Sequence, residues 1–515
     1  MTWDKEIEEL RQRQALARAM GGEEKVARQH KAGRLTVRER IDALLDPGSF
    51  REIGSITGVA GYDESGALAT FTPTNFVFGR GRIARRSVVV AGDDFTVRGG
   101  ASDASIIEKQ VAAEQMAHDL RLPLVRLVEG SGGGGSVKSL ESLGYTYVPY
   151  LPGWEFMVRN LATVPVVSLG LGPIAGFGAA KTVASHYCVL VRGQAQMFVA
   201  GPPVVAAAGQ KLTKEELGSS RIHASNGAID DEVASEQEAF ERARRFLSYL
   251  PSSVYELPAR GPTDDDPVRR DEFLLGAVPR DRREVYRMRP IVEAVVDAGS
   301  FFELGRLHGR SVITGLARLD GWPVGVVASD PFVMGGLWTA ASSAKLERFV
   351  SFAETFHLPV VHFVDNPGFM IGKQAEQEGT IRAGVRALTA VYQANVPWCT
   401  ILVRKVFGVA GAGHQNHTRF HYRYAWPSGD WGSLPIEGGI EAAYKADLDA
   451  APDRAARAAE IAERLNRVRS PFRSAERFQV EEIIDPRDTR SVLCEFANLA
   501  APLRQPGPVA FGYRP

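Results

Sequence analysis

The hydrophobic residues of this chain gather in short uninterrupted runs, separated by longer segments in which apolar and polar positions alternate with a helical period. Four valine-rich runs lie at residues 87–95, 122–130, 323–332 and 358–366. Runs of this length that are rich in β-branched residues predict buried strands. The segments 105–120 and 342–356 between them predict helices, as do the more polar segments 6–20 and 453–468. Alternating strands and helices predict an α/β fold.

The two halves of the chain repeat each other. Three segments match in the same order, at slowly drifting offsets of 251, 236 and 232 residues: 38–58 with 289–309, 90–129 with 326–365, and 162–169 with 394–401. Nine of 21 positions are identical in the first pair. The period is far too long for a solenoid, so we interpret the chain as two tandem copies of one domain.

The boundary between the copies is expected in residues 256–271, which are rich in proline and charge. We therefore assign residues 1–262 to an N-terminal domain and residues 263–515 to a C-terminal domain. A length of 515 residues also favours two domains, because a single hydrophobic core seldom grows to that size.

Composition excludes several classes of protein. The 61 basic residues balance the 61 acidic ones, which argues against a nucleic-acid partner. Three cysteines, far apart, give neither a disulfide framework nor a zinc ribbon and favour a reducing, cytoplasmic compartment. The charged N-terminus resembles neither a signal nor a transit peptide. The uncharged stretch 160–180 has the length of a membrane span, but its prolines and glycines favour a buried strand followed by a turn.

Glycine-rich turns follow several predicted strands. The turn at 129–136 includes Gly132, Gly133 and Gly134, and its position inside a domain favours ligand binding over a flexible linker. The third match in the repeat places the turn around Gly176 opposite the turn around Gly408. Two equivalent turns would offer backbone N–H groups for two separate oxyanions, although plain strand-to-helix packing is an equal alternative.

The turn at Gly176 fits the common nucleotide-binding motifs poorly. A dinucleotide fingerprint needs an acidic residue about 20 positions later, and residues 156–214 contain none. A phosphate-binding loop needs glycine before Lys181, where this chain has Ala180. Nor does the sequence contain a nucleophile elbow or an H-E-x-x-H motif.

Three histidines, His414, His417 and His421, could share a helix face, but the first acidic residue after them is Asp430. A metal site would need a carboxylate or cysteine nearby, so we expect no metal in this chain. The sequence therefore favours catalysis by backbone dipoles over catalysis by a side-chain nucleophile or a metal.

Several long motifs carry a resemblance to a known family over nearly the whole chain. The chain resembles the carboxyltransferase (β) subunits of biotin-dependent acyl-CoA carboxylases, the group of propionyl-CoA and 3-methylcrotonyl-CoA carboxylases. The motifs are HKAGRLTVRERIDALLDPGSF (30–50), DFTVRGG (94–100), GPIAGFGA (172–179), FVAGPPVV (198–205), EELGSSRIH (215–223), LSYLPSS (247–253), VDNPGFMIG (364–372), EGTIRAG (378–384) and YAWPSGDWGS (424–433).

The resemblance implies a fold, an activity and site residues. It implies two crotonase-like ββα-spiral domains, the first binding acyl-CoA and the second biotin. It implies that carboxybiotin releases CO2, that biotin takes the α-proton of the acyl-CoA, and that the enolate attacks CO2. Carried over by motif, the thioester oxyanion hole falls at Gly176 and Phe177, and the biotin hole at Val409 and Ala410 after Gly408. Gly99 and Gly100 of the DFTVRGG motif, together with the 129–136 glycines, are expected to bind substrate.

This chain departs from the family pattern at the expected site. Phe177 and Val409 stand where relatives commonly have glycine, and Phe177 adds bulk beside the thioester. Ala412 replaces an acidic residue that lines the acyl pocket of propionyl-type enzymes, so a more apolar pocket is expected there. Leu434 and Pro435 replace a Met-Gly pair. These changes leave the acyl substrate open.

The resemblance also implies partners, because the chain has neither a biotin-acceptor motif nor an ATP site. A biotin carboxylase and a biotin carboxyl carrier are expected on other subunits, and a homohexamer within a larger complex. We expect no membrane partner, and a cytoplasmic enzyme or, in a eukaryote, a mitochondrial one. Two alternatives stay open: a subunit of a biotin-dependent transcarboxylase or decarboxylase, and a non-catalytic scaffold of a carboxylase complex.

Overall fold

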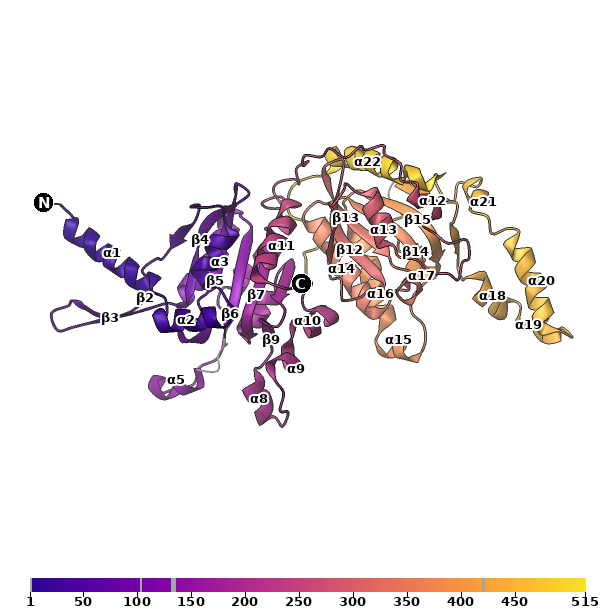
Figure 1. Cartoon of the computed structure of the whole chain (residues 1–515). Coiled ribbons are helices and arrows are strands. Elements are labelled where there is room, and N and C mark those ends of the chain that lie inside the picture. The colour runs from indigo at the N-terminus through magenta and orange to yellow at the C-terminus, as the bar shows by residue number, and fades with distance from the viewer. Residues whose placement is uncertain (1, 102–103, 131–135, 419–421) are drawn as a thin grey trace. The chain divides into compact units, whose positions relative to one another are not determined.

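The computed structural model describes residues 2–101, 104–130, 136–418 and 422–515. The chain divides into two compact units (Figure 1): unit 1 comprises Met1–Glu256 with Arg514–Pro515, and unit 2 comprises Leu257–Tyr513. The change from one unit to the other thus lies at the start of the charged, proline-rich segment 256–271.

Unit 1 is built on an eight-stranded sheet in the order β1-β4-β5-β6-β7-β8-β10, with β9 paired to the end of β7. Its strands are β1 (Arg51–Ile53), β4 (Phe76–Ile83), β5 (Arg86–Asp93), β6 (Leu124–Gly130), β7 (Val166–Ala175), β8 (Tyr187–Val191), β9 (Gln196–Phe198) and β10 (Asp231–Val233). The pairs β1–β4 and β4–β5 are antiparallel, and the other pairs are parallel. A separate hairpin joins β2 (Gly58–Tyr62) to β3 (Leu68–Pro73).

Helices cover both faces of this sheet. The helices of this unit are α1 (Asp4–Arg18), α2 (Glu23–Lys31), α3 (Val37–Leu44), α4 (Ile107–Leu120), α5 (Ser136–Leu143), α6 (Trp154–Leu161), α7 (Phe177–Val183), α8 (Pro202–Ala207), α9 (Lys214–Gly218), α10 (Ser220–Asn226) and α11 (Glu236–Ser248), with a 3-10 turn η1 (Arg98–Gly100). Helix α4 buries Ala113 and Ala117 against Val89 and Ala91 of β5. Helices α3 and α11 contact each other and the strands of the opposite face.

Unit 2 repeats the sheet of unit 1. Its order is β11-β12-β13-β14-β15-β16-β18, with β17 paired to the end of β15. The strands are β11 (Phe302–Leu304), β12 (Val312–Leu319), β13 (Trp322–Ser329), β14 (Val360–Asn366), β15 (Trp398–Phe407), β16 (Tyr422–Ala425), β17 (Asp430–Gly432) and β18 (Glu482–Ile483). Again the first two pairs are antiparallel and the rest parallel.

The helices of unit 2 are α12 (Phe273–Gly276), α13 (Arg289–Val295), α14 (Ala340–Thr355), α15 (Lys373–Gln377), α16 (Thr380–Gln393), α17 (Gly408–Ala412), α18 (Ile436–Ala443), α19 (Lys445–Ala450), α20 (Arg454–Asn466), α21 (Pro471–Ala475) and α22 (Thr489–Ala500), with 3-10 turns η3 (Met334–Gly336), η4 (Pro486–Asp488) and η5 (Ala501–Leu503). Helices α13 and α22 share the main core with β12 and β13, and α14 packs on α16.

The register of the strands confirms the duplication residue by residue. In unit 1 the β6–β7 pairing shifts between Val128 and Gly130, and in unit 2 the β14–β15 pairing shifts between Val364 and Asn366, 236 positions later. The same irregularity at the same place means that both sheets present the turns after β7 and β15 in the same way. The α/β fold expected from the hydrophobic pattern is confirmed.

The local predictions were accurate to within a few residues. The predicted helices at 105–120 and 342–356 correspond to α4 and α14, and those at 6–20 and 453–468 correspond to α1 and α20. The uncharged stretch 160–180 forms the end of α6, then β7, then the start of α7. No helix among the described residues is long and apolar enough to cross a membrane.

Candidate active site

Two equivalent turns follow equivalent parallel strands, β7 in unit 1 and β15 in unit 2. In unit 1, β7 runs into α7 through Gly176, and in unit 2, β15 runs into α17 through Gly408. Gly176 has φ 59° and Gly408 has φ 62°, a backbone conformation that side-chain-bearing residues rarely adopt. The sequence therefore needs glycine at both positions, and the backbone turns sharply there from strand to helix.

In the turn of unit 1, the backbone N–H groups that can still donate to a ligand come after Gly176. The Gly176 N–H itself is donated to the Phe198 carbonyl of β9, at 3.2 Å. Phe177 is the first helical residue, so its N–H has no acceptor within the helix. A side chain at Gly176 would meet no atom within 4 Å, so the outer side of this turn is open. The Phe177 ring lies 6.2 Å from that of Trp154 in α6, which holds it beside the turn.

The turn of unit 2 has the same backbone form, but different residues surround it. A Cβ at Gly408 would stand 3.4 Å from the Ser433 carbonyl oxygen, about van der Waals contact, so the positive φ and not a lack of space calls for glycine here. Val409 is 60% exposed, whereas Ala410 is buried against the core. Ala412, at the end of α17, is exposed. Of these side chains, only those of Val409 and Ala412 face outward.

The glycine pair of the DFTVRGG motif forms η1 and has a packing role. Gly99 and Gly100 have φ of 64° and 65°. A Cβ on Gly100 would stand 2.6 Å from the Glu129 carbonyl oxygen, so the chain can pass β6 this closely only with glycine. Gly336 of η3 repeats the arrangement, 2.3 Å from the Asp365 carbonyl oxygen. Gly132, Gly133 and Gly134, which were expected to bind substrate, lie outside the described residues.

A buried carboxylate lies near the end of β6 in unit 1 and of β14 in unit 2. Glu129 accepts hydrogen bonds from Arg34, from Gln29 (2.9 Å) and from Arg40 (2.5 Å). Arg40 also binds Glu236 through two hydrogen bonds of 2.8 Å. Burial raises the pKa of Glu129, and the arginines oppose that effect.

Asp365 is the equivalent residue of unit 2, but its arginine comes from another element. Arg404 of β15 donates to it at 2.9 Å, the Lys405 N–H at 3.0 Å and the Tyr286 hydroxyl at 2.8 Å. Burial raises the pKa of Asp365. Sequence reasoning did not find these networks, although the match of 90–129 with 326–365 ends on the two acids and marked them as equivalent.

Buried side chains of the neighbouring strands form hydrogen bonds with the end of each helix that follows a turn. Arg126 of β6 donates to the carbonyls of Lys181 (3.0 Å) and Ala184 (2.7 Å) at the end of α7. His362 of β14 makes a hydrogen bond of 3.1 Å to the His414 carbonyl just after α17. The same carbonyl accepts from Trp398 at 2.9 Å. These bonds hold the helices whose first residues form the two turns.

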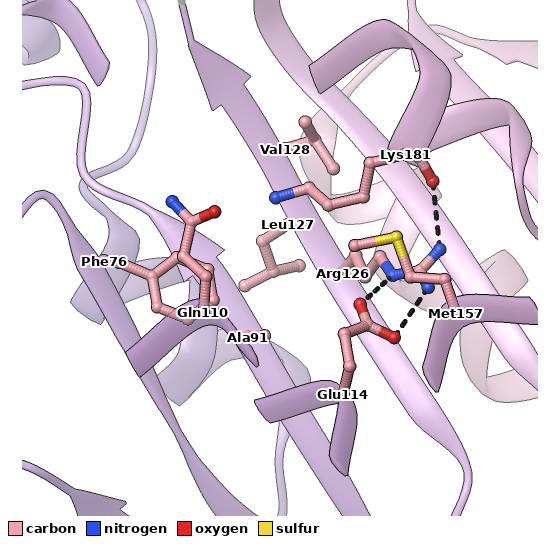
Figure 2. A pocket seen from close by; sticks show the side chains of 9 residues that line it. All are labelled: Phe76, Ala91, Gln110, Glu114, Arg126, Leu127, Val128, Met157 and Lys181. Carbon is pink, nitrogen blue, oxygen red and sulfur yellow. Dashed lines mark hydrogen bonds and ion pairs between the residues drawn. The ribbon is translucent and has the colours of Figure 1, made fainter. Parts of the chain in front are cut away.

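A small cavity lies below the turn of unit 1, between the sheet and helices α4, α6 and α7 (Figure 2). It measures about 10 Å³, the room that one water molecule needs. Its walls are Phe76, Ala91, Gln110, Glu114, Arg126, Leu127, Val128, Met157 and Lys181. Glu114 and Arg126 close on each other through hydrogen bonds of 2.7 and 2.8 Å, while the Lys181 side chain extends across the cavity toward Gln110.

Comparison with known proteins identifies the family of the chain. Residues 28–506 match the model of the carboxyl transferase domain, and the chain belongs to this family. The two sheets with their equivalent turns are crotonase-like carboxyltransferase units, and the chain is a biotin-dependent acyl-CoA carboxyltransferase subunit.

Similar proteins cover nearly the whole chain. A propionyl-CoA carboxylase carboxyltransferase subunit of Haloferax mediterranei is 33% identical over 503 residues, which is 96% of this chain and 95% of that protein. A methylmalonyl-CoA decarboxylase subunit alpha of Veillonella parvula is 31% identical over 521 residues, 100% of this chain and 99% of that protein. The transcarboxylase 12S structure, a hexamer with methylmalonyl-coenzyme A bound, matches with a TM-score of 0.88 and 30% identity over 99% of each chain.

Proposed function

We propose that this chain carboxylates an acyl-CoA at the carbon next to the thioester, with the enolate held in unit 1 and the biotin ureido group held in unit 2. The observation that carries the proposal is the pair of equivalent glycine turns at Gly176 and Gly408, in a chain that belongs to the carboxyl transferase family. Two turns, each lined by backbone N–H groups, suit a reaction with two oxyanions.

In unit 1 the proposed task is to stabilise the thioester enolate. Removing a proton next to a thioester places negative charge on its oxygen, and backbone N–H groups fixed in advance stabilise that charge without reorganising. Because Phe198 already accepts the Gly176 N–H, the donors we assign begin at Phe177. Gly176 itself supplies the conformation that turns them outward. Phe177, held by Trp154, limits the space beside the thioester.

In unit 2 the proposed task is to bind the biotin that a partner protein delivers. Carboxybiotin supplies the CO2 and afterwards a nitrogen that accepts the α-proton. The sharp turn at Gly408, which has φ 62°, is proposed to present the N–H groups that follow it to the ureido oxygen. We assign the N–H groups of Val409 and Ala410 to its oxygen, and the exposed Val409 side chain to contact with the ring. Ala412, one helical turn later, faces the acyl group.

We further propose the assembly and compartment. The similar transcarboxylase 12S protein is a hexamer, and on this basis we propose a hexamer for this chain. We propose that the hexamer works with a biotin carboxylase and a biotin carrier. All three cysteines are free and buried, in keeping with a reducing compartment such as the cytoplasm. The glycines at 99–100 and 132–134 remain proposed contacts of the CoA moiety.

The test is a carboxylation assay on the complete complex. The chain is combined with its biotin-bearing partner, ATP and bicarbonate, and 14C incorporation is followed over acyl-CoAs of increasing length. Incorporation into an acid-stable product supports the proposal, and incorporation into none supports the scaffold alternative. The decarboxylase alternative is favoured by the Veillonella relative. Release of CO2 from methylmalonyl-CoA that exceeds forward carboxylation would establish it.

A further inference from the structure

The cavity of unit 1 is lined by a mostly buried lysine whose ammonium group has no hydrogen bond to the described part of the protein. Lys181 is 8% exposed, and its nearest charged partner among the described residues is Asp93, with 3.6 Å between Nζ and Oδ1. Its ammonium has three donors, and none has an acceptor within hydrogen-bond distance in the part of the chain that the structure describes. The centroid of the Phe76 ring lies 5.6 Å from Nζ, but an aromatic ring has no lone pair that could accept a hydrogen bond. No described protein group takes up these donors, which leaves them to water or to a bound ligand.

The fold alone does not require this polar cavity, because unit 2 has filled the same space. At the offsets of the repeat, Lys181 corresponds to Gly413, and Gln110 and Glu114 correspond to Leu346 and Val350. A Cβ on Gly413 would stand 3.0 Å from the Trp338 ring and 2.4 Å from Leu388, so side chains occupy that position. Among the described residues, unit 1, the proposed acyl-CoA unit, keeps this space and lines it with donors.

The charge and the size of the cavity favour a small uncharged acceptor as the ligand group that Lys181 binds. Glu114 and Arg126 satisfy each other, which leaves Lys181 balanced by Asp93 alone. An added carboxylate would lie close to Asp93 and would make the cavity net negative, a costly state at this burial. A hydroxyl or carbonyl oxygen accepts from the ammonium without adding charge. The volume of about 10 Å³ admits one such group in place of one water.

The position of Lys181 connects the cavity with the reacting end of the substrate. Lys181 follows Phe177 by four residues in α7, on the same helix face and about 6 Å along the axis. An acyl chain whose thioester lies at the Phe177 amide and whose tail follows α7 would reach the ammonium within a few carbons.

We propose that this cavity selects short acyl-CoA substrates whose chain ends in an uncharged oxygen, with Lys181 donating to that oxygen and Gln110 lining the opposite side. This proposal rests on the proposed function, because it assumes that the thioester lies at the turn of unit 1. It assigns Lys181 a role in specificity and leaves the chemistry at the thioester unchanged.

The experiment compares matched acyl-CoA pairs on the assembled complex. Butanoyl-CoA is compared with 4-hydroxybutanoyl-CoA, and hexanoyl-CoA with 6-hydroxyhexanoyl-CoA, with succinyl-CoA as the charged probe. The wild type should prefer one hydroxylated substrate over its plain partner in kcat/KM, and should discriminate against succinyl-CoA. Lys181→Met should remove or reverse the preference by about 10- to 100-fold, the value of a hydrogen bond to a charged donor. Lys214→Met, a lysine exposed on α9, serves as the control.

The outcomes separate the two proposals. If no acyl-CoA is carboxylated, the proposed function fails. If plain acyl-CoAs are used as well as hydroxylated ones, and Lys181→Met changes nothing, the cavity holds water only and this inference is overturned while the function stands. Should Lys181→Met fail to fold, Gln110→Leu, which introduces the residue found at the equivalent position of unit 2, probes the same cavity from α4. An unchanged hydroxyl preference in Gln110→Leu would also overturn the inference.

Discussion

Arg126 and His362 occupy the same position in the two copies of the domain and perform the same task with different chemistry. Arg126 is paired in register with Ala91 and Ser168, and His362 with Val327 and Thr400, at the offsets of the repeat. Each reaches a backbone carbonyl at the end of the helix after the glycine turn. Unit 1 uses a guanidinium with its own buried counter-ion, and unit 2 uses an uncharged imidazole.

The first prediction concerns the replacement of Arg126 and its counter-ion by residues like those at the equivalent positions of unit 2. Arg126→His leaves Glu114 buried without its cation, which should cost about 3–5 kcal/mol of unfolding free energy. Adding Glu114→Val, the residue at the equivalent position in unit 2, removes the unpaired charge and should recover most of that loss. Urea unfolding of the wild type, the single and the double variant measures both steps. A double variant less stable than the single would contradict this account.

The second prediction concerns acid sensitivity. Burial lowers the pKa of His362 to about 4, whereas an unfolded histidine titrates near 6.5. Between these values the unfolded chain binds a proton that the folded chain does not, so stability falls as the pH drops from about 6.5 to 4, by up to about 3 kcal/mol. His362→Asn keeps a donor for the His414 carbonyl but does not titrate.

In His362→Asn the slope of unfolding free energy against pH should therefore decrease in this window by about one proton, or about 1.4 kcal/mol per pH unit. His414, whose pKa burial lowers to about 3, keeps its own contribution in the same window. Chemical unfolding at intervals from pH 7 to 4 provides the measurement. Identical slopes in variant and wild type would show that His362 is not the group responsible.

The third prediction separates the two turns. Gly176→Ala and Gly408→Ala force a side chain into a positive-φ conformation, at a cost of about 1–3 kcal/mol in strain, which moves the donors beyond. We expect carboxylation to fall about 100-fold or more in each variant. Gly176→Ala should slow exchange of the acyl-CoA α-proton with solvent, and Gly408→Ala should slow carboxyl transfer to free biotin.

Gly299→Ala is the matched control for strain, because Gly299 has φ 68° and no atom within 4 Å of a Cβ, in a turn that contains neither candidate hole. Its folding cost should resemble that of the other two variants while its activity stays near wild type. A Gly299 variant as inactive as the others would attribute their effect to folding.

The fourth prediction compares two adjacent glycines. Gly335 and Gly336 both have positive φ, but only a Cβ on Gly336 would collide with a backbone oxygen, that of Asp365 at 2.3 Å. Gly336→Ala should therefore prevent η3 from packing on β14 and lower the melting temperature far more than Gly335→Ala. Equal losses would show that backbone strain alone explains the pair.

The fifth prediction tests the acyl pocket at α17. If Ala412 contacts the acyl group, Ala412→Asp should reduce kcat/KM for apolar or branched acyl-CoAs more than for propionyl-CoA. The side chain is exposed in the chain by itself, so the substitution should leave the melting temperature unchanged. An unchanged substrate profile would reject the placement of Ala412.

The repeat in the sequence predicted most of the fold, because strands buried on both faces must be apolar and the same glycines recur where the backbone needs them. Gly176 and Gly408 were found in this way. The use of the Gly176 N–H by Phe198 could not be foreseen, since β9 joins β7 only through pairing in the sheet. The buried state of Lys181 was equally hidden, because a lysine in a helix is usually exposed and only the packed α4 and α6 enclose this one.

Because Glu129 and Asp365 have different partners, the two units depend on different segments of the chain to neutralise their buried acid during synthesis. Asp365 finds Arg404 on the adjacent strand, so the sheet of unit 2 carries its own counter-charge. The sheet of unit 1 has glycine at the equivalent position, Gly172, and Glu129 is paired instead with Arg40 of α3, outside the sheet. During translation the N-terminal segment leaves the ribosome before the strand that needs it, so the acid never lacks its cation. A circular permutation that moved this segment to the far end of the chain would reverse that order and leave unit 1 exposed to aggregation while synthesis continued.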